Sequence, residues 1–283
     1  MRFGKLFRYD LRSGFTSCIF RLAGIVVLVL VSCAEMYFRK HTVYRLADAV
    51  PAAGYMDYLC YLLGGIREYV PGGEENFLFP AKWFLFHLLV QYGCLHYSVR
   101  DLSSLGSTVL PRSGNRTAWW LSKCLWNCCY VTVVYALTAG AVLLFCAAAG
   151  EPVNLQVTPE LLNTLMGAGC FYETIPAEFS LVVVGLPFLI SLGNSLIQLV
   201  LTLFLKPMFS FGIAAAFLLC GAYRNLPIFW ETFAMPVRSA YVVENGFAAA
   251  QGAVIALTAA VLAAVTGTVC FKRKNILRTE GGQ

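Results

Sequence analysis

Long apolar runs separated by short polar segments dominate this sequence. Because a helix needs about 20 apolar residues to cross a bilayer core of about 30 Å, each long run predicts a membrane-spanning helix. The first run is preceded by Ile19 and Phe20, and with these two included the fifth run is the shortest. The chain is therefore predicted to be an all-α polytopic membrane protein with six transmembrane helices, forming a single domain over residues 1–283. The six runs cover residues 22–36, 77–97, 125–149, 179–205, 208–223 and 247–271.

Composition agrees with this interpretation. Hydrophobic residues make up 59% of the chain and charged residues 13%, against roughly 45–50% and about 25% in soluble domains. An ordinary soluble enzyme is thereby excluded. With an even number of spans both chain ends lie on one side, and the positive-inside rule identifies that side. Lys and Arg concentrate in the two ends and in segment 98–123, whereas segment 150–177 has neither.

The formal net charge of +6 is therefore interpreted as an orientation signal and not as a nucleic-acid-binding surface. Both termini are predicted to be cytoplasmic. The predicted location is the cell membrane, with multiple passes, in a bacterial plasma membrane.

The first 17 residues predict an amphipathic helix lying along the inner membrane surface. Its aromatic and leucine residues recur at helical spacing, and its basic residues occupy the other side. A disordered basic tail is the alternative. The run ending at Cys33 loosely resembles a lipoprotein signal-peptidase site, but signal peptides have shorter charged regions before the apolar run. The apolar set is Phe3, Leu6, Phe7, Leu11 and Phe15, and the basic set is Arg2, Lys5, Arg8 and Arg12.

Segment 98–123 is the most informative of the connections. Its sequence predicts a short polar helix ending at Gly106 and then a Pro/Gly turn with two arginines, and Trp119 and Trp120 open the next span. A solvated loop is the alternative. On the outer side, segment 224–246 is apolar and aromatic but too short to cross the bilayer, so it predicts short re-entrant-like helices that enter the outer interface.

Common nucleotide-binding, catalytic and metal-binding motifs are absent from the sequence. It has no phosphate loop, no H-E-x-x-H and no G-x-S-x-G motif. Its eleven cysteines show no metal-ligand spacing, so no metal site and no catalytic residue are predicted. Cys60 and Cys170 are both predicted to face outward. They are taken as unpaired, although sequence alone does not decide their pairing.

Polar residues inside the spans form the other candidate site. His87 and Gln91 lie one helical turn apart in the second span, while Asn194 and Gln198 belong to a polar stripe in the fourth. These four residues serve either interhelical hydrogen bonding or a substrate path. The span interiors lack carboxylates apart from boundary residues, which argues against an ion-coupled carrier.

The order of these features resembles the membrane subunit of an ABC transporter, the ABC-2 type permease family. The resemblance covers nearly the whole chain. It rests on the N-terminal segment 5–11, the six spans, the helix-turn segment between spans two and three, the short turn at Lys206-Pro207, the apolar helices before span six and the basic tail 271–277. No single motif is diagnostic.

The resemblance implies a subunit of an ATP-driven exporter. Segment 98–123 would then carry a coupling helix that docks on a separate ATPase subunit, which would bind ATP and Mg²⁺. This chain would bind no cofactor itself. A second permease chain, identical or homologous, and membrane lipid are the other expected partners. The expected docking residues are Arg100, Asp101, Leu102, Ser104, Leu105, Arg112 and Arg116.

Two other classes of function remain open. One is a non-transport membrane protein that acts as an assembly, immunity or sensor component. The other is an intramembrane enzyme, which the spans disfavour because they lack the paired carboxylates, metal ligands and nucleophile arrangements that such chemistry needs. Neither the substrate nor the direction of transport follows from the residues.

Overall fold

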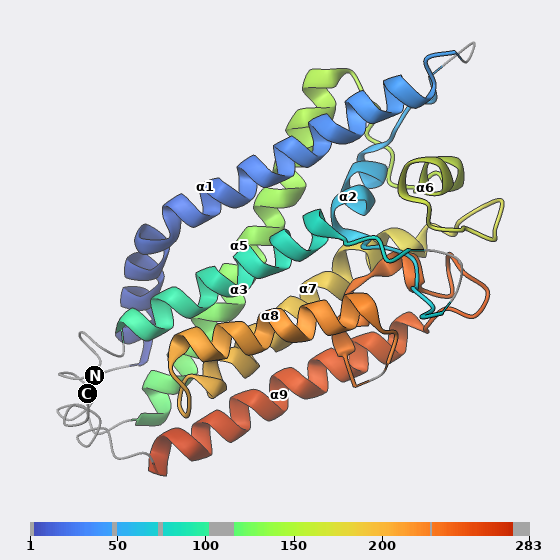
Figure 1. The fold of residues 1–283 in the computed structure, drawn as a ribbon. Coiled ribbons are helices and arrows are strands. Elements are labelled where there is room, and N and C mark those ends of the chain that lie inside the picture. The colour runs from blue at the N-terminus through green and yellow to red at the C-terminus, as the bar shows by residue number, and fades with distance from the viewer. Residues whose placement is uncertain (1–2, 47–49, 73–75, 102–115, 227, 274–283) are drawn as a thin grey trace.

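The computed structural model describes residues 3–46, 50–72, 76–101, 116–226 and 228–273. Within these ranges the chain is helical and forms no β-strand (Figure 1). Six long helices lie over the six predicted apolar runs, although their ends differ from the runs by several residues. The helices are α1 (Phe3–Val43), α2 (Tyr55–Leu63), α3 (Ala81–Asp101), α5 (Arg116–Ala149), α6 (Pro159–Met166), α7 (Glu178–Leu201), α8 (Pro207–Tyr223) and α9 (Ala249–Arg273), with the 3₁₀ helices η2 (Trp230–Ala234) and η3 (Pro236–Arg238).

Four helices, α1, α5, α7 and α9, are long and apolar enough to cross a membrane. The chain is therefore a helical membrane protein, as its composition predicts. The other two predicted spans are weaker by the same measures. Helix α8 is apolar but has 17 residues, and α3 carries Lys82, His87, Gln91 and Arg100 among its 21 residues.

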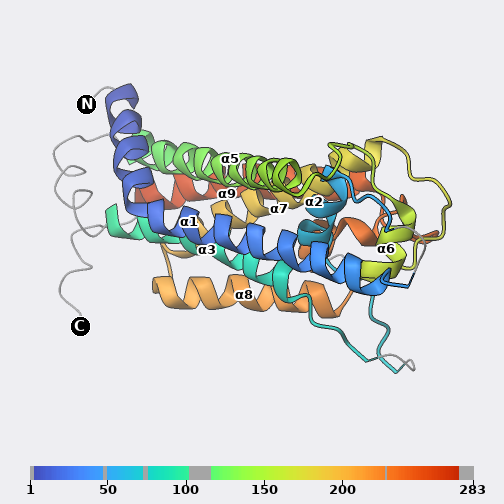
Figure 2. The same cartoon turned by 90° about the horizontal axis from the view of Figure 1, so that it is seen from above.

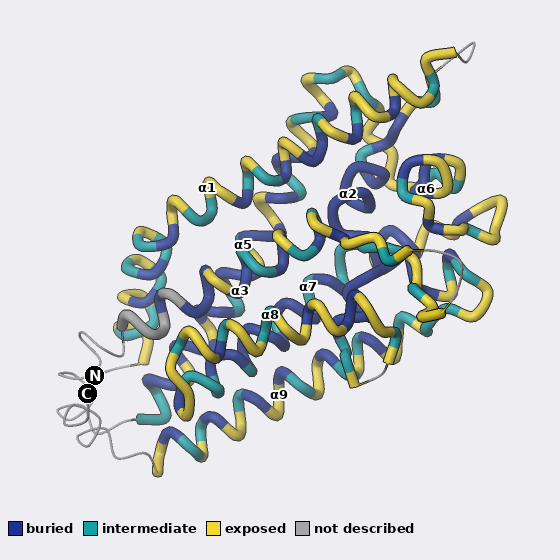
Figure 3. Tube along the Cα trace, in the orientation of Figure 1, coloured by how far each residue is buried: buried dark blue, intermediate teal, exposed yellow. Residues whose placement is uncertain are grey.

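The two ends of the helical bundle differ in construction. The first turns of α1, the last turns of α9 and the turn between α7 and α8 lie together at one end (Figures 1 and 2). The short helices α2, α6, η2 and η3 gather at the other end. We call the first of these two ends the terminal end and the second, with the short helices, the cap end. The cap consists of packed structure, since every residue of α2 after Tyr55 is buried (Figure 3).

Helix α1 is a single element of 41 residues, about 60 Å long at the helical rise. The interfacial helix predicted for residues 1–17 is thus not a separate element. The segment contains no proline that would end a helix. Figure 2 shows instead that the first turns of α1 bend away from the rest of the same helix.

One face of α1 is buried from Asp10 to Lys40. The buried positions recur every three or four residues, as expected for a helix packed along one side. The stripe begins and ends on a charged residue. Its members are Asp10, Gly14, Cys18, Ile25, Val29, Ser32, Cys33, Met36 and Lys40.

Small residues allow the long helices to approach closely. A Cβ atom at Gly93 of α3 would overlap the Tyr130 ring, and one at Gly267 of α9 would overlap the Trp120 ring. Both rings are completely or almost completely buried and belong to α5. Two aromatic side chains of α5 therefore determine how closely α3 and α9 pack against it.

Segment 224–246, predicted to form short helices, contains η2 and η3. Its residues from Glu231 to Ser239 are all buried. The guanidinium of Arg238 donates hydrogen bonds to main-chain carbonyls of Ile66, Gly221 and Ala222. This side chain thus joins the connection after α2, the end of α8 and η3 inside the cap. Entry of the segment into a membrane interface remains a prediction.

Candidate functional site

A buried cluster of polar groups lies where α1, α3 and α5 meet at the terminal end. Asp10 of α1 accepts a hydrogen bond of 2.6 Å from Lys123 Nζ and one of 2.8 Å from the Tyr97 hydroxyl. The Ser122 hydroxyl donates to the other carboxylate oxygen. Asp10 and Lys123 have no exposed side-chain surface. We call these four residues the basal cluster.

The local sequence explains how each member reaches the cluster. Asp10 lies one turn before Gly14 and two turns before Cys18, on the buried stripe of α1. Ser122 and Lys123 lie in the second turn of α5, and Tyr97 lies one turn before the end of α3. Burying two charges is tolerable only when they pair and their remaining hydrogen-bonding capacity is used. The basal cluster meets that condition for the carboxylate of Asp10.

A second charged contact joins the same two helices at the cap end. Lys40, at the other end of the α1 stripe, pairs with Glu151 just beyond α5, and both side chains are more than 90% buried. Thirty residues separate Asp10 from Lys40, and twenty-eight separate Lys123 from Glu151. At the helical rise these spans are about 45 Å and about 42 Å. Helices α1 and α5 therefore run in the same direction and are joined by an ion pair near each end.

The predicted docking residues lie next to the basal cluster only in part. Arg100 and Asp101 form the end of α3, where the structure describes the backbone alone. Arg116 opens α5, and its guanidinium donates to the main-chain oxygen of Lys272 across 3.1 Å. The remaining predicted docking residues, Leu102, Ser104, Leu105 and Arg112, lie outside the described residues.

The four polar residues predicted for a substrate path are all buried. His87 Nδ1 of α3 lies 3.0 Å from Ser191 Oγ of α7, and the Tyr135 hydroxyl of α5 lies 3.0 Å from the same oxygen. Asn194 Oδ1 accepts a hydrogen bond of 2.7 Å from Trp230 Nε1. His87 and Asn194 thus take part in interhelical contacts, as one of the two interpretations expects.

Gln91 and Gln198 differ from the other two residues. Each is about 1% exposed, and both side-chain amide atoms of each have no hydrogen-bond partner. Asn127 Oδ1 of α5 is buried without a partner as well, although its amide nitrogen donates to the Ser195 carbonyl across 3.4 Å. A buried polar atom without a partner costs on the order of 1–3 kcal/mol. The interior between α3, α5 and α7 therefore contains hydrogen-bond donors and acceptors that no other group of the described residues uses. We call the buried side chains of Gln91, Asn127 and Gln198 the polar interior.

Glu231 of η2 extends this polar interior toward the cap. Its carboxyl group lies beside Asn194 and the Trp230 indole, and burial raises its pKa to about 7. One of its oxygens is buried without a partner. Nothing in the sequence distinguishes Glu231, because it falls in a connection where acidic residues are usually solvated.

Asp10 and Lys123 were also not predicted as a pair. In the sequence, Asp10 falls in the basic N-terminal segment and Lys123 in segment 98–123, where charges are ordinarily assigned to the membrane surface. The usable signal is the position of Asp10 on the side of the helix that carries Gly14 and Cys18, opposite Arg8 and Arg12. When a charged residue lies on the same helix face as small residues, that face is expected to pack against another helix. The charged residue is then expected to have a buried partner.

The cysteines of the described residues form no disulfide. Cys60 is buried in α2, and Cys170 Sγ donates to the Tyr172 carbonyl across 3.4 Å. Over the described ranges, no three His, Cys, Asp or Glu side chains are grouped so that they could hold a metal ion.

Comparison with known proteins identifies no family for this chain. No protein-family model, no curated protein and no solved structure matches it.

Proposed function

We propose that this chain is the membrane-spanning permease subunit of an ATP-driven exporter of the ABC-2 type. In this proposal it crosses the plasma membrane six times with both termini in the cytoplasm. It pairs with a second permease chain, and a separate ATPase subunit carries the ATP and Mg²⁺. The chain itself has no ATPase site and moves the substrate.

The basal cluster is the observation that supports this proposal most directly. It joins the first turns of α1, the last turn of α3 and the first turns of α5. The end of α3 and the start of α5 flank residues 102–115, the middle of segment 98–123 that would dock on the ATPase. A displacement of that segment would therefore be transmitted to α1, α3 and α5 through one buried set of contacts. A flexible connection would not transmit it.

The second charged contact connects the same two helices at the cap end. Because Lys40 and Glu151 join α1 and the chain just beyond α5 at the far end, a displacement of the basal cluster moves both helices as one body. In the proposed cycle, closure of the ATPase pair displaces this body relative to α7 and α9. The polar interior lies along the boundary between them.

That polar interior is the proposed substrate path. Gln91 and Gln198 offer amide groups that are buried and have no partner. Among the described residues, few charged side chains lie along this path. The carboxyl group of Glu231 lies at its cap end. The path therefore favours a substrate with uncharged polar groups that hydrogen-bond to amides.

The proposal is tested by capture of the ATPase. The full chain, tagged and expressed in its native membrane, is purified in mild detergent, and the co-purifying proteins are identified together with their ATP hydrolysis. We expect one ATPase with a phosphate loop in stoichiometric amount. The variant R100A/D101A should lose it, because both residues belong to the proposed docking segment 98–123 and form the end of α3.

A matched variant controls for the loss of charge. Arg45 and Glu173 are exposed at the cap end, so R45A/E173A removes the same two charges far from the docking segment and should retain the ATPase. Equal recovery from both variants would refute the assigned docking surface. A pure preparation without an ATPase would refute the permease and favour a non-transport protein that binds another partner.

A further inference from the structure

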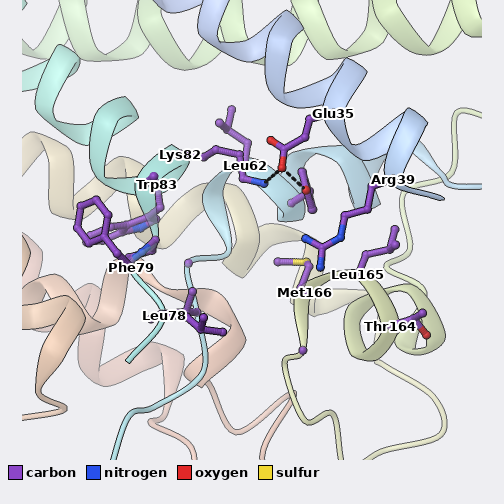
Figure 4. A pocket seen from close by; sticks show the side chains of 16 residues that line it. Glu35, Arg39, Leu62, Leu78, Phe79, Lys82, Trp83, Thr164, Leu165 and Met166 are labelled. Atoms are coloured by element: carbon purple, nitrogen blue, oxygen red, sulfur yellow. Dashed lines mark hydrogen bonds and ion pairs between the residues drawn. The ribbon is translucent and has the colours of Figure 1, made fainter. Parts of the chain in front are cut away.

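A cavity at the cap end belongs to neither the basal cluster nor the polar interior. Its volume is about 470 Å³, within the range of roughly 300–1,000 Å³ that small-ligand pockets occupy. Its walls come from the last turns of α1, the end of α2, residues 78–83 at the start of α3 and the end of α6 (Figure 4).

Three charged side chains line the cavity, and two of them form an ion pair. Lys82 Nζ lies 3.1 Å from Glu35 Oε1, which also accepts a hydrogen bond of 2.9 Å from the Tyr61 hydroxyl. The same ammonium group lies 3.5 Å from the centre of the Tyr61 ring. Glu35 and Lys82 therefore neutralise each other and are held in place by one aromatic residue.

Arg39 supplies the excess positive charge. It follows Glu35 by one helical turn on α1, and Figure 4 shows its guanidinium extending into the cavity above Met166. No acidic side chain of the described residues forms an ion pair with it. A guanidinium binds phosphate and carboxylate oxygens through two parallel hydrogen bonds. The cavity thus presents a group suited to an anion.

The remaining surface of the cavity is largely apolar. Leu78 and Phe79 are 71% and 48% exposed at its rim, and Leu62, Leu165 and Met166 line its interior. A free inorganic anion would leave these side chains in contact with water. A ligand that carries an apolar chain next to its anionic group would cover them.

The position of the cavity indicates where such a ligand comes from. Helix α1 is one of the four helices able to cross a membrane, and its apolar run ends at Met36, between Glu35 and Arg39. The cavity therefore lies at the depth where lipid headgroups meet acyl chains. Arginine at such a boundary is well placed to contact a headgroup.

We infer that this cavity binds an anionic membrane phospholipid, with its phosphate on Arg39 and the start of an acyl chain against Leu78, Phe79 and Met166. The cavity holds the headgroup and the adjoining methylene groups, and the rest of the lipid remains in the bilayer. Binding of this kind does not depend on whether the chain transports a substrate.

Equilibrium binding of radiolabelled dioctanoyl phosphatidylglycerol to the purified full chain in neutral detergent tests the inference. Arg39→Gln should weaken binding about tenfold, the loss expected when a hydrogen-bonded charge contact is removed. Arg39→Lys keeps the charge without the paired donors and should give an intermediate affinity. Arg45→Gln removes an exposed charge just beyond the end of α1 and should bind as the unmodified protein does.

Two competitors separate the parts of the ligand. Glycerol phosphate has the phosphate without the apolar chain, and dioctanoylglycerol has the chains without the phosphate, so neither should displace the lipid at equal concentration. Equal displacement by glycerol phosphate would reduce the cavity to an anion site, and equal displacement by dioctanoylglycerol would reduce it to an apolar groove. Either result, or unchanged binding in Arg39→Gln, would overturn the inference.

Discussion

Lys123 Nζ lies 2.6 Å from Asp10 Oδ1, and both side chains are completely buried. Removing one member of a buried ion pair leaves an uncompensated charge and typically costs about 3–5 kcal/mol. We therefore expect Lys123→Met to lower the thermal unfolding temperature of the detergent-solubilised protein markedly. Lys5→Met is the matched control, because Lys5 is exposed on the same end of the chain, and its unfolding temperature should not change.

The double variant D10A/K123M distinguishes the ion pair from simple loss of packing. It removes both charges, so it should unfold at a higher temperature than Lys123→Met, in which the carboxylate remains. If the double variant is the less stable of the two, the uncompensated charge is not the cause.

The sequence predicts the long helices well but not their lengths or their contacts. Apolar runs are a local signal, and a helix lies over every predicted span. The helix ends depend on neighbours: α1 continues from Phe3 to Val43 because its buried stripe has packing partners beyond the apolar run. The predicted interfacial helix 1–17 becomes part of that stripe for the same reason.

The sequence predicts members of the candidate site only where a polar residue lies inside an apolar run. His87, Gln91, Asn194 and Gln198 stand out because polar residues interrupt apolar runs, and all four are buried. The pairing of Asp10 with Lys123 crosses 113 residues of sequence, and no periodicity relates the two. Each lies near an end of its helix, where a charge is ordinarily assigned to the membrane surface.

Gly267 controls the approach of α9 to α5. A methyl group there would overlap the Trp120 ring, whose Nε1 donates to the Ala264 carbonyl across 3.2 Å. Gly267→Ala should therefore push the two helices apart and lower the unfolding temperature. Gly140→Ala in α5 meets no atom within 4 Å, so it should leave stability unchanged or raise it by about 0.5–1 kcal/mol through helix propensity. Equal effects of the two substitutions would contradict this packing.

Arg238 should be indispensable to the cap. It is about 2% exposed, and its replacement by methionine would leave the carbonyls of Gly221 and Ala222 without their donor. Buried groups that lose their partners cost on the order of 1–3 kcal/mol each. We expect Arg238→Met to lower the unfolding temperature and to make the connection after α8 sensitive to limited proteolysis. Arg224→Met, at an exposed position, should do neither.

Glu231 should make stability depend on pH. Burial raises its pKa from an ordinary 4.5 to about 7, so the folded protein binds this proton more tightly than the unfolded chain does. Stability should therefore fall as the pH rises from about 4.5 to about 7, because over that interval only the folded state still holds the proton. Glutamine keeps the size of the side chain and does not titrate.

We accordingly expect Glu231→Gln to match the unmodified protein near pH 4.5 and to unfold at a higher temperature at pH 8. Thermal unfolding of both proteins over this pH range in one detergent measures the difference. Glu244→Gln, at an exposed position, controls for the change in net charge and should follow the unmodified protein throughout. A gap between Glu231→Gln and the unmodified protein that stays constant with pH would mean that the carboxyl group of Glu231 does not titrate in this interval, and that the amide acts through packing or hydrogen bonding alone.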